Sequence, residues 1–380
     1  MNRKMTIAIV AGIRSQYMKL CAFQRMLNYI DNCIKEKFNF IYINAGQHYG
    51  HDLAQGYISD LKIKFDYELV HNSTEPIEIL GSMVIHLYEL FVELKRSKDL
   101  DYIMVFGDAN ATLAGAIAAS KAKVKLIHVE SGLRVGDNSS PEEGNRIVAD
   151  HLATIRFVSN KPDFNNIIRE GLIEDTFFSG DIIYDLVMDI AKQEFPTIYI
   201  EEKGLVRPYE YDNFVLASMH REENLYEDLL PRLFEVLNQI NHKVLFVAHP
   251  RELEKIEELH YDKSKITVAN HVNYLDMLAA ISKCKYIITD SGAIQREAYY
   301  LKKRCLIRQE RAFWQSLVDL GVHILIGKTI HEMQEGIEWV EKVAEVTVDY
   351  PKTDDLGNGH AVETILKKLI EVGGLENEIG

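Results

Sequence analysis

The sequence lacks the features that mark secreted, disulfide-rich and membrane-spanning proteins. Its four cysteines, Cys21, Cys33, Cys284 and Cys305, are scattered with no close pair at metal-ligand spacing. We therefore expect buried, reduced thiols in a cytoplasmic protein. No apolar run reaches the ~20 residues that a membrane-spanning helix needs. The first apolar stretch, Thr6–Ala11, is too short for a signal sequence and is predicted to be a buried strand.

Several common enzyme motifs are also missing. The chain has no GxGxxG fingerprint, which weakens the case for a nicotinamide cofactor, and no GxxxxGK[ST], HExxH or GxSxG sequence. Its formal net charge of -14 argues against nucleic acid or an anionic membrane as the main partner. An anionic small ligand is compatible with this charge if its pocket is locally basic or is built from backbone N–H groups.

Short apolar runs alternate with longer amphipathic segments from end to end, which is typical of parallel sheets covered by helices. A chain of 380 residues is too long for one ordinary core, so we expect two α/β domains. The strands predicted in the first half are Thr6–Ala11, Phe40–Ala45, Tyr102–Phe106, Lys125–Val129, Arg156–Ser159 and Thr176–Ser179. Those predicted in the second half are Asn213–Ala217, Lys243–Ala248, Ile266–Ala269, Tyr286–Thr289, Cys305–Arg308 and Ile324–Ile326.

The boundary between the two domains is expected near the middle of the chain. Residues 193–211 carry two prolines, Gly204 and a cluster of charge, and are predicted to link a first domain of residues 1–192 to a second of residues 212–360. Residues 361–380 are expected to form a last helix that packs back on the first domain. Open parallel sheets bind ligands at the carboxyl ends of their strands, so we expect a cleft between the domains lined by residues that follow strands.

One candidate site is the turn Asp290-Ser291-Gly292, which joins a predicted strand to a predicted helix. The free N–H groups and the positive dipole end at such a helix start suit a diphosphate. Ser291 is equally well explained as an ordinary helix N-cap. Glu297, further along the helix, could accept hydrogen bonds from both hydroxyls of a ribose, or it could lie on a solvated helix face.

A second group of charged residues follows the strand Lys125–Val129. The segments SGLR and PEEGNR place Glu130, Arg134, Glu142 and Arg146 close together along the chain. Acids beside arginines can take different pKa values, as general acid and base catalysis requires. A structural ion-pair network is the alternative explanation.

Further charged residues follow other strands. Asp108 ends a strand in the first half, where it could face the same site or cap the Ala-rich helix that follows. Arg14 and Lys19 come shortly after the first strand. His220 and Arg221, in the second half, form a pair suited to phosphate oxygens, although a lone histidine is more often structural.

Placed in order, these segments resemble the non-hydrolysing UDP-N-acetylglucosamine 2-epimerases. The resemblance runs from Gly12 to about Ala361 and is strongest in GDANATLAG, HVESGLR, PEEGNR, MHREEN and TDSGAIQREA. It implies two Rossmann-like domains in a glycosyltransferase-B-like architecture, a homodimer, and no metal or redox cofactor. It also implies inversion at C2 of a UDP-N-acetylamino sugar, in which UDP is eliminated to give a 2-acetamidoglucal and is then added back, in the service of polysaccharide biosynthesis.

The resemblance also implies roles for individual residues. Asp108, Glu130 and Glu142 would share the acid, base and intermediate-stabilising roles, in an order that the sequence leaves open. The departing diphosphate would be held or neutralised by Arg14, Lys19, Arg146 and His220, of which Lys19 and His220 are counted with the catalytic groups. Ser291 and Gly292, with Arg221, would bind the diphosphate, Glu297 the ribose, and Arg308 the region beside it.

Several departures from the family leave the sugar open. Gln16 and the short segment between Arg134 and Pro141 resemble relatives that act on UDP-2,3-diacetamido-2,3-dideoxy-glucuronate, and the usual acidic turn after Arg308 is replaced. The Gln-His-x-Gln run through which substrate activates bacterial members is here Gln47-His48-Tyr49-Gly50, so activation by that route is also open. The alternative classes are a glycosyltransferase-B-type transferase, which has no need of HVESGLR and PEEGNR, and an inactive UDP-sugar sensor.

Overall fold

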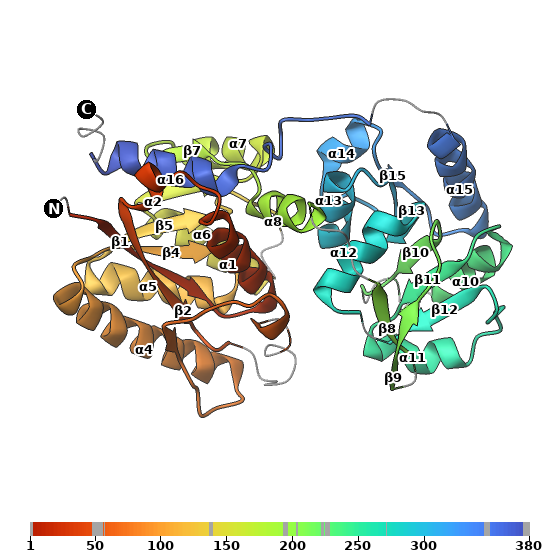
Figure 1. Ribbon diagram of the computed structural model, residues 1–380, viewed down its shortest axis with the longest axis horizontal. Coiled ribbons are helices and arrows are strands. Elements are labelled where there is room, and N and C mark those ends of the chain that lie inside the picture. Colours follow the sequence, from red (N-terminus) through yellow and green to blue (C-terminus); the bar gives the residue numbers. More distant parts are fainter. Residues whose placement is uncertain are drawn as a thin grey trace. The chain divides into compact units, whose positions relative to one another are not determined.

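The computed structural model describes residues 3–47, 56, 58–136, 140–192, 197–202, 204–221, 224, 229–270, 272–345 and 350–374 (Figure 1). Its contacts divide the chain into two compact units, one made of Met1–Leu186 with Asp354–Gly380 and the other of Val187–Thr353. Each unit contains one parallel sheet. The domain boundaries expected from the sequence, at residues 192, 211 and 360, stay predictions.

The first unit is built on a seven-stranded parallel sheet in the order β3-β2-β1-β4-β5-β6-β7. Every residue of β1 is buried, because helices cover both faces of the sheet, and this is why continuous apolar runs predict its strands. The strand order reverses between β1 and β4, which is the place where such sheets bind ligands. The strands are β1 (Met5–Ala11), β2 (Phe38–Asn44), β3 (Tyr67–Glu68), β4 (Leu100–Phe106), β5 (Lys125–Val129), β6 (Ile155–Val158) and β7 (Thr176–Phe178).

Helices cover this sheet on both faces, with α4 and α5 together on one face and α16 on the other (Figure 1). The alanines and glycine of α5 let it approach the sheet closely, since a Cβ added at Gly115 would lie 2.8 Å from Cγ1 of Val105 in β4. The helices are α1 (Arg14–Met26), α2 (Asn32–Lys35), α4 (Pro76–Ser97), α5 (Asn110–Ala122), α6 (Pro141–Leu152), α7 (Lys161–Arg169), the first half of α8 (Ile182–Ala191), which continues into the second unit, and α16 (Ala361–Val372).

Helix α16 comes from the end of the chain and packs beside α1. Its amino terminus is held by the buried carboxylate of Asp185 in α8, which accepts hydrogen bonds from the backbone N–H groups of Ala361 and Val362, both at 2.9 Å. A helix start leaves its first N–H groups without partners inside the helix. Asp185 therefore ties the last helix to the first unit.

Replacing Asp185 with alanine is expected to lower the free energy of unfolding by about 1–3 kcal/mol, because two buried N–H donors lose their acceptor. Urea unfolding followed by circular dichroism measures this change. Glu363→Ala is the matched control, since that carboxylate lies in the first turn of the same helix but is partly exposed. Equal stability of Asp185→Ala and Glu363→Ala would contradict the assigned capping role.

The second unit repeats the same plan with a six-stranded parallel sheet in the order β12-β11-β10-β13-β14-β15. Its order reverses between β10 and β13. The strands are β10 (Val215–Ser218), β11 (Val244–Val247), β12 (Ile266–Ala269), β13 (Tyr286–Thr289), β14 (Cys305–Ile307) and β15 (Ile324–Leu325). The helices are α10 (Leu229–Gln239), α11 (Pro250–Glu257), α12 (Tyr274–Lys283), α13 (Gly292–Tyr300), α14 (Gln315–Asp319) and α15 (Ile330–Glu345).

An antiparallel hairpin lies in the segment that the sequence analysis treats as a linker. It consists of β8 (Ile198–Glu202) and β9 (Leu205–Tyr209), joined through Gly204 at a positive φ of 78°. The hairpin packs on the second unit, because the Tyr199 N–H donates to Asp276 at 2.9 Å. Pro208 and the charged residues of this segment obscure the alternation of buried and exposed residues that is typical of a hairpin.

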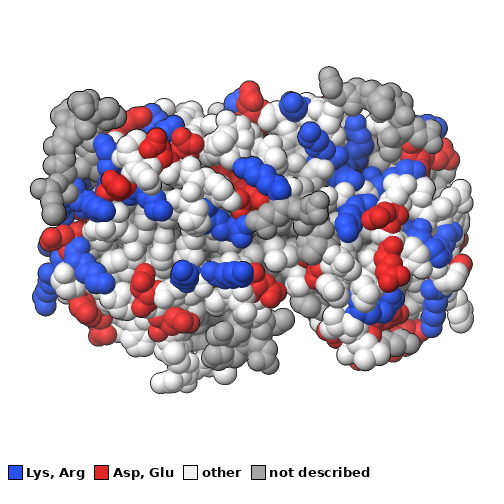
Figure 2. All heavy atoms as spheres, in the orientation of Figure 1, with Lys and Arg blue, Asp and Glu red and all other residues white. Residues whose placement is uncertain are grey.

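The surface carries one departure from expectation. All four cysteines are free, but Cys33 is exposed, so the prediction of a buried thiol is wrong for this residue, which lies on the short surface helix α2. Basic and acidic side chains are interspersed on the face seen in Figure 2. Among the described helices, none is long and apolar enough to cross a membrane.

Candidate functional site

The carboxyl ends of β1, β4 and β5 bring Lys19 and Glu130 together. Lys19, in the second turn of α1, is buried and its ammonium pairs with the Glu130 carboxylate directly after β5. Gly107, directly after β4, leaves room for this pair, since a Cβ there would lie 3.1 Å from both charged groups. Glu130 has a positive φ of 64°, a strained conformation for a residue with a side chain, and such strain concentrates at functional sites.

A second ion pair joins Asp108 to Arg146. The Arg146 Nε–H donates to Oδ2 of Asp108 at 2.9 Å, and its Nη1 donates to Oε2 of Glu143 at 2.7 Å. Glu143 also accepts hydrogen bonds from the N–H groups of Val135 and Gly136, so α6 is linked to the segment after HVESGLR. Asp108 is thus held by a cation rather than capping α5, for which Ala109 is the N-cap residue.

Glu142 and Glu143 are neighbours in sequence with different surroundings. Glu143 is buried, whereas Glu142 is exposed and accepts a hydrogen bond from the Ser140 hydroxyl at 2.6 Å. That hydrogen bond holds the pKa of Glu142 below its usual value. The resemblance to the family selects Glu142, whereas the buried acid that contacts Arg146 is its neighbour Glu143. The role expected for Glu142 stays a prediction.

Asp150 is a further residue that the sequence analysis missed. Its fully buried carboxylate accepts hydrogen bonds from Nδ1 of His128 at 2.6 Å, the Ser131 hydroxyl and the Gly132 N–H at 3.1 Å, and it pairs with Arg134 at 2.8 Å. Burial alone would raise the pKa of Asp150, but His128, Ser131 and Arg134 together hold it well below its usual value. One carboxylate therefore organises the whole HVESGLR segment around Glu130.

Asp163 is a buried acid close to this group. Burial raises the pKa of Asp163 to about 7, opposed by a hydrogen bond from Asn160 and assisted by the negative charges of Glu130 and Asp150. Asp163 is not among the residues that the sequence singles out. Groups that exchange a proton near neutral pH are frequent in active sites.

Gln16 connects the loop after β1 to the end of β4. Its buried amide accepts from the Gly12 N–H at 2.8 Å and donates to the Phe106 carbonyl at 2.9 Å and the Thr112 hydroxyl at 2.8 Å. Gln16, at which the chain differs from many family members, therefore holds the loop that leads into α1, where Arg14 lies. Arg14 itself is exposed at the first position of α1, and its predicted role is untested.

In the second unit, Asp290 organises the residues that follow β10. Its buried carboxylate accepts from the N–H groups of His220 at 3.0 Å and Arg221 at 2.9 Å, and from the Asn224 amide at 2.7 Å. Nδ1 of His220 lies 3.3 Å from the buried Glu252 carboxylate. The loop after β10 and the turn after β13 are thus joined at the point where the strand order reverses.

Ser291 is the N-cap residue of α13 and accepts a hydrogen bond from the Ile294 N–H at 3.4 Å. The capping explanation of Ser291 is therefore correct, and a role in diphosphate binding would be additional. Glu297 is only 3% exposed, which excludes a solvated helix face for it.

A basic pocket of about 380 Å³ lies beside this turn. Among the described residues that line it, Arg221, Arg308, Arg311 and Lys328 are basic and one, Glu310, is acidic; Glu310 pairs with Lys328 at 3.2 Å. In a chain with a net charge of -14, such a local excess of cations suits an anionic ligand.

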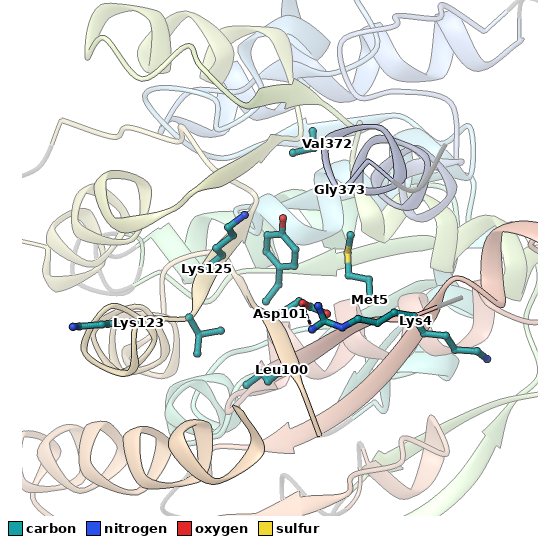
Figure 3. A pocket seen from close by; sticks show the side chains of 11 residues that line it. Lys4, Met5, Leu100, Asp101, Lys123, Lys125, Val372 and Gly373 are labelled. Atoms are coloured by element: carbon teal, nitrogen blue, oxygen red, sulfur yellow. Dashed lines mark hydrogen bonds and ion pairs between the residues drawn. The ribbon is translucent and has the colours of Figure 1, made fainter. Parts of the chain in front are cut away.

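A second pocket, of about 400 Å³, lies in the first unit, where the strands β1, β4 and β5 begin (Figure 3). Lys4 and Lys123 line it, but in Figure 3 their side chains point outward in opposite directions. The Asp101 carboxylate on its wall is already engaged by Arg3 at 2.8 Å and the Thr6 N–H at 2.9 Å. The charged groups after β1, β4 and β5 are at the other ends of these strands.

Comparison with known proteins identifies the family. The family model described as UDP-N-acetylglucosamine 2-epimerase matches residues 32–370. A UDP-N-acetylglucosamine 2-epimerase homolog from Methanococcus maripaludis is 32% identical, with 96% of this chain and 99% of the relative covered. The chain belongs to the UDP-N-acetylglucosamine 2-epimerase family.

Other members of this epimerase family differ in their sugar. A UDP-2,3-diacetamido-2,3-dideoxy-D-glucuronate 2-epimerase from Pseudomonas aeruginosa is 30% identical, covering 85% of this chain and 88% of that protein. The crystal structure of the Methanocaldococcus jannaschii UDP-GlcNAc 2-epimerase in complex with UDP-GlcNAc and UDP matches with a TM-score of 0.76 at 26% identity, covering 97% of this chain and 100% of that one.

The comparisons confirm the predicted fold class and isomerase class. Both units have the Rossmann-like α/β plan, and the epimerase structures match over nearly the whole chain. MurG from Acinetobacter baumannii also matches with a TM-score of 0.51 at 12% identity, a likeness that concerns the glycosyltransferase-B-like fold alone.

Proposed function

We propose that this chain is a non-hydrolysing 2-epimerase that interconverts a UDP-N-acetylamino sugar with its C2 epimer, of the UDP-GlcNAc to UDP-ManNAc type. The observation that carries the proposal is the pairing of two acids with two cations, Glu130 with Lys19 and Asp108 with Arg146, where β1, β4 and β5 end. Epimerisation at an unactivated carbon needs a base to remove the proton and an acid to return it on the opposite face.

Glu130 and Asp108 are the groups to which we assign the proton transfers. The base takes the proton from C2, the C–H electrons form a C1=C2 double bond, and the C1–O bond to UDP breaks. Re-addition of UDP with protonation of C2 from the other face gives the epimer. We assign Glu142 to stabilisation of the intermediate and Lys19 to neutralisation of the departing diphosphate.

The second unit supplies the residues that we assign to UDP. The amino terminus of α13 at Ser291 and Gly292, together with Arg221 and Arg308, would hold the diphosphate, as helix starts and arginines commonly do. Departing UDP carries one more negative charge than the sugar ester, so a basic pocket stabilises it more than the substrate.

Four further residues complete the assignment. Glu297 would accept the ribose hydroxyls, and His220, Arg14 and Arg146 would neutralise the charge that develops on the leaving group. Binding that grows with this charge lowers the barrier rather than merely tightening the complex.

A second sugar is a specific alternative to N-acetylglucosamine in the substrate. The Pseudomonas aeruginosa relative supports UDP-2,3-diacetamido-2,3-dideoxy-glucuronate, as do Gln16 and the short segment from Arg134 to Pro141. We place the enzyme in the cytoplasm, where its free cysteines stay reduced, and in polysaccharide biosynthesis.

Incubating the chain with each UDP-sugar separately and recording proton NMR spectra tests the proposal. We expect the C2 epimer to accumulate from UDP-GlcNAc or from the diacetamido-uronate, without an acceptor. Transfer of the sugar to an added acceptor, with no epimer from either donor, would favour the transferase class instead.

We further propose a homodimer that forms through the outer face of α4. Ile77, Ile85 and Tyr88 on this helix are 73%, 58% and 41% exposed, which is unusual for large apolar side chains on one helix. Burying them against a second copy would remove this apolar area from water.

Ile85→Asp is expected to shift the chain from dimer to monomer, because a charge would be buried at the centre of the apolar face. Sedimentation velocity measures the change. Leu205→Asp, at a 72% exposed apolar position on the hairpin, is the matched control and should leave the dimer intact. A monomeric wild-type chain, or a dimeric Ile85→Asp variant, would contradict this face.

A further inference from the structure

We propose that Phe313 is a positioning residue for UDP binding, which holds the Arg221 guanidinium and covers the start of α13. The inference rests on the proposed function, because it concerns the pocket that would bind UDP. Phe313 lies in the segment after β14 where the chain departs from the usual family sequence.

The Phe313 ring lies directly against Gly292. A Cβ added at Gly292 would lie 3.1, 3.2 and 3.4 Å from three atoms of the Phe313 side chain, so a larger residue there would require Phe313 to shift. The next residue fixes the same contact, because the indole N–H of Trp314 donates to the Gly292 carbonyl at 2.8 Å. Trp314 in turn lies under the guanidinium of Arg296, 5.2 Å from the ring centroid.

Phe313 also contacts Arg221. The Arg221 guanidinium carbon lies 4.8 Å from the centroid of the Phe313 ring, within the range of a cation–π interaction. The Nε–H of the same guanidinium donates to the Asp290 carbonyl at 3.2 Å. Two contacts from different elements therefore fix the plane of a side chain that lines the basic pocket.

This arrangement has a consequence for binding. A flexible arginine loses rotational freedom when it binds a phosphate, and a guanidinium that is already oriented loses less. The ring also keeps water away from one side of the helix start, where low local polarity strengthens interactions with an anion. Phe313 therefore contributes to affinity for UDP without taking part in proton transfer.

The test compares Phe313→Leu with Phe313→Tyr in the full chain. Phe313 is 46% exposed, so its removal leaves the core intact. We expect Phe313→Leu to raise KM for the UDP-sugar, and Kd for UDP, by about 2- to 30-fold, with kcat changed less than about twofold. Phe313→Tyr keeps the ring and should restore the wild-type constants.

Tyr211→Leu is the matched control, because Tyr211 is 43% exposed and its ring lies 5.1 Å from the ammonium of Lys243. A double variant tests the coupling to Arg221. If Phe313 acts through Arg221, then adding Phe313→Leu to Arg221→Ala weakens UDP binding no further than Arg221→Ala does alone.

Several results would overturn the inference. These are unchanged UDP binding in Phe313→Leu, an equal loss in Tyr211→Leu, and additive losses in the double variant. Failure of the proposed function gives a different result, since the wild-type chain would then form no C2 epimer, whereas the effect of Phe313→Leu on Kd for UDP is measured without turnover.

Discussion

Replacing Glu130 with glutamine is expected to reduce turnover by about 10²–10⁴-fold, because the amide cannot exchange the C2 proton. The side chain keeps its size, and Gly107 still leaves room beside Lys19. The same loss is expected for Asp108→Asn, which keeps an oxygen that can accept the Arg146 hydrogen bond. Initial rates of epimer formation, followed by NMR at saturating UDP-sugar, measure both effects.

The control for Glu130→Gln is Glu174→Gln, an exposed glutamate in the same unit. It should turn over at the wild-type rate. Circular dichroism must show that the folded content of each variant is unchanged. If Glu130→Gln and Asp108→Asn both retain near-normal rates while folded, the acid and base chemistry is located elsewhere.

Replacing Asp150 with asparagine is expected to lower the free energy of unfolding by about 3–5 kcal/mol, as loss of one partner in a buried ion pair commonly does. The amide removes the charge that Arg134 and His128 contact, and it cannot accept from every donor that converges on Asp150. Urea unfolding measures the change, with the exposed Asp60→Asn as its control. A stability equal to that of Asp60→Asn would show that this network contributes little to folding.

The pH dependence of stability provides an independent check on Asp150. Its pKa in the folded chain is depressed, so the folded state holds the charged form more strongly than the unfolded state does. The resulting stability is present above the pKa of an unfolded aspartate, about 3.9, and is lost as the pH falls below it. The Asp150→Asn variant lacks this titrating carboxylate. Its free energy of unfolding should therefore fall less than that of the wild-type chain between about pH 5 and pH 3, where an unfolded aspartate takes up its proton.

The parallel strands are the part of the fold that the sequence predicts well. Strands such as β1 and β13 are buried on both faces, so each is a nearly continuous apolar run in the sequence. Such a run predicts a strand without information about which strands pair with it. Strand β3 is only two residues long and carries no such run. The hairpin of β8 and β9 depends on packing against α12, which local sequence does not specify.

The sequence predicts which kinds of residue form the candidate site, but not which of these residues contact one another. Residues after strands could be selected from sequence because parallel strands bring their carboxyl ends to one edge. Which of Glu142 and Glu143 faces inward depends on how α6 packs, and sequence alone does not fix this. Asp150 had an available signal, since it lies four residues after Arg146 and hence on the same face of α6.

Other residues gave no such signal. Asp163 acquires its raised pKa from burial beside Glu130, which is far away in the chain. Phe313 contacts Gly292 and Arg221 from a segment whose sequence differs from the family. Long-range packing determines both, so only the folded chain identifies them.

Removal and replacement of the C2 proton are tested most directly by exchange with solvent. The chain is incubated in heavy water with UDP-GlcNAc and, separately, with UDP-2,3-diacetamido-2,3-dideoxy-glucuronate, and the C2 position is followed by proton NMR. We predict that deuterium enters C2 of substrate and epimer for at least one sugar, and that Glu130→Gln slows this exchange. No deuterium at C2 in either sugar, with UDP still bound by the wild-type chain, would contradict the account.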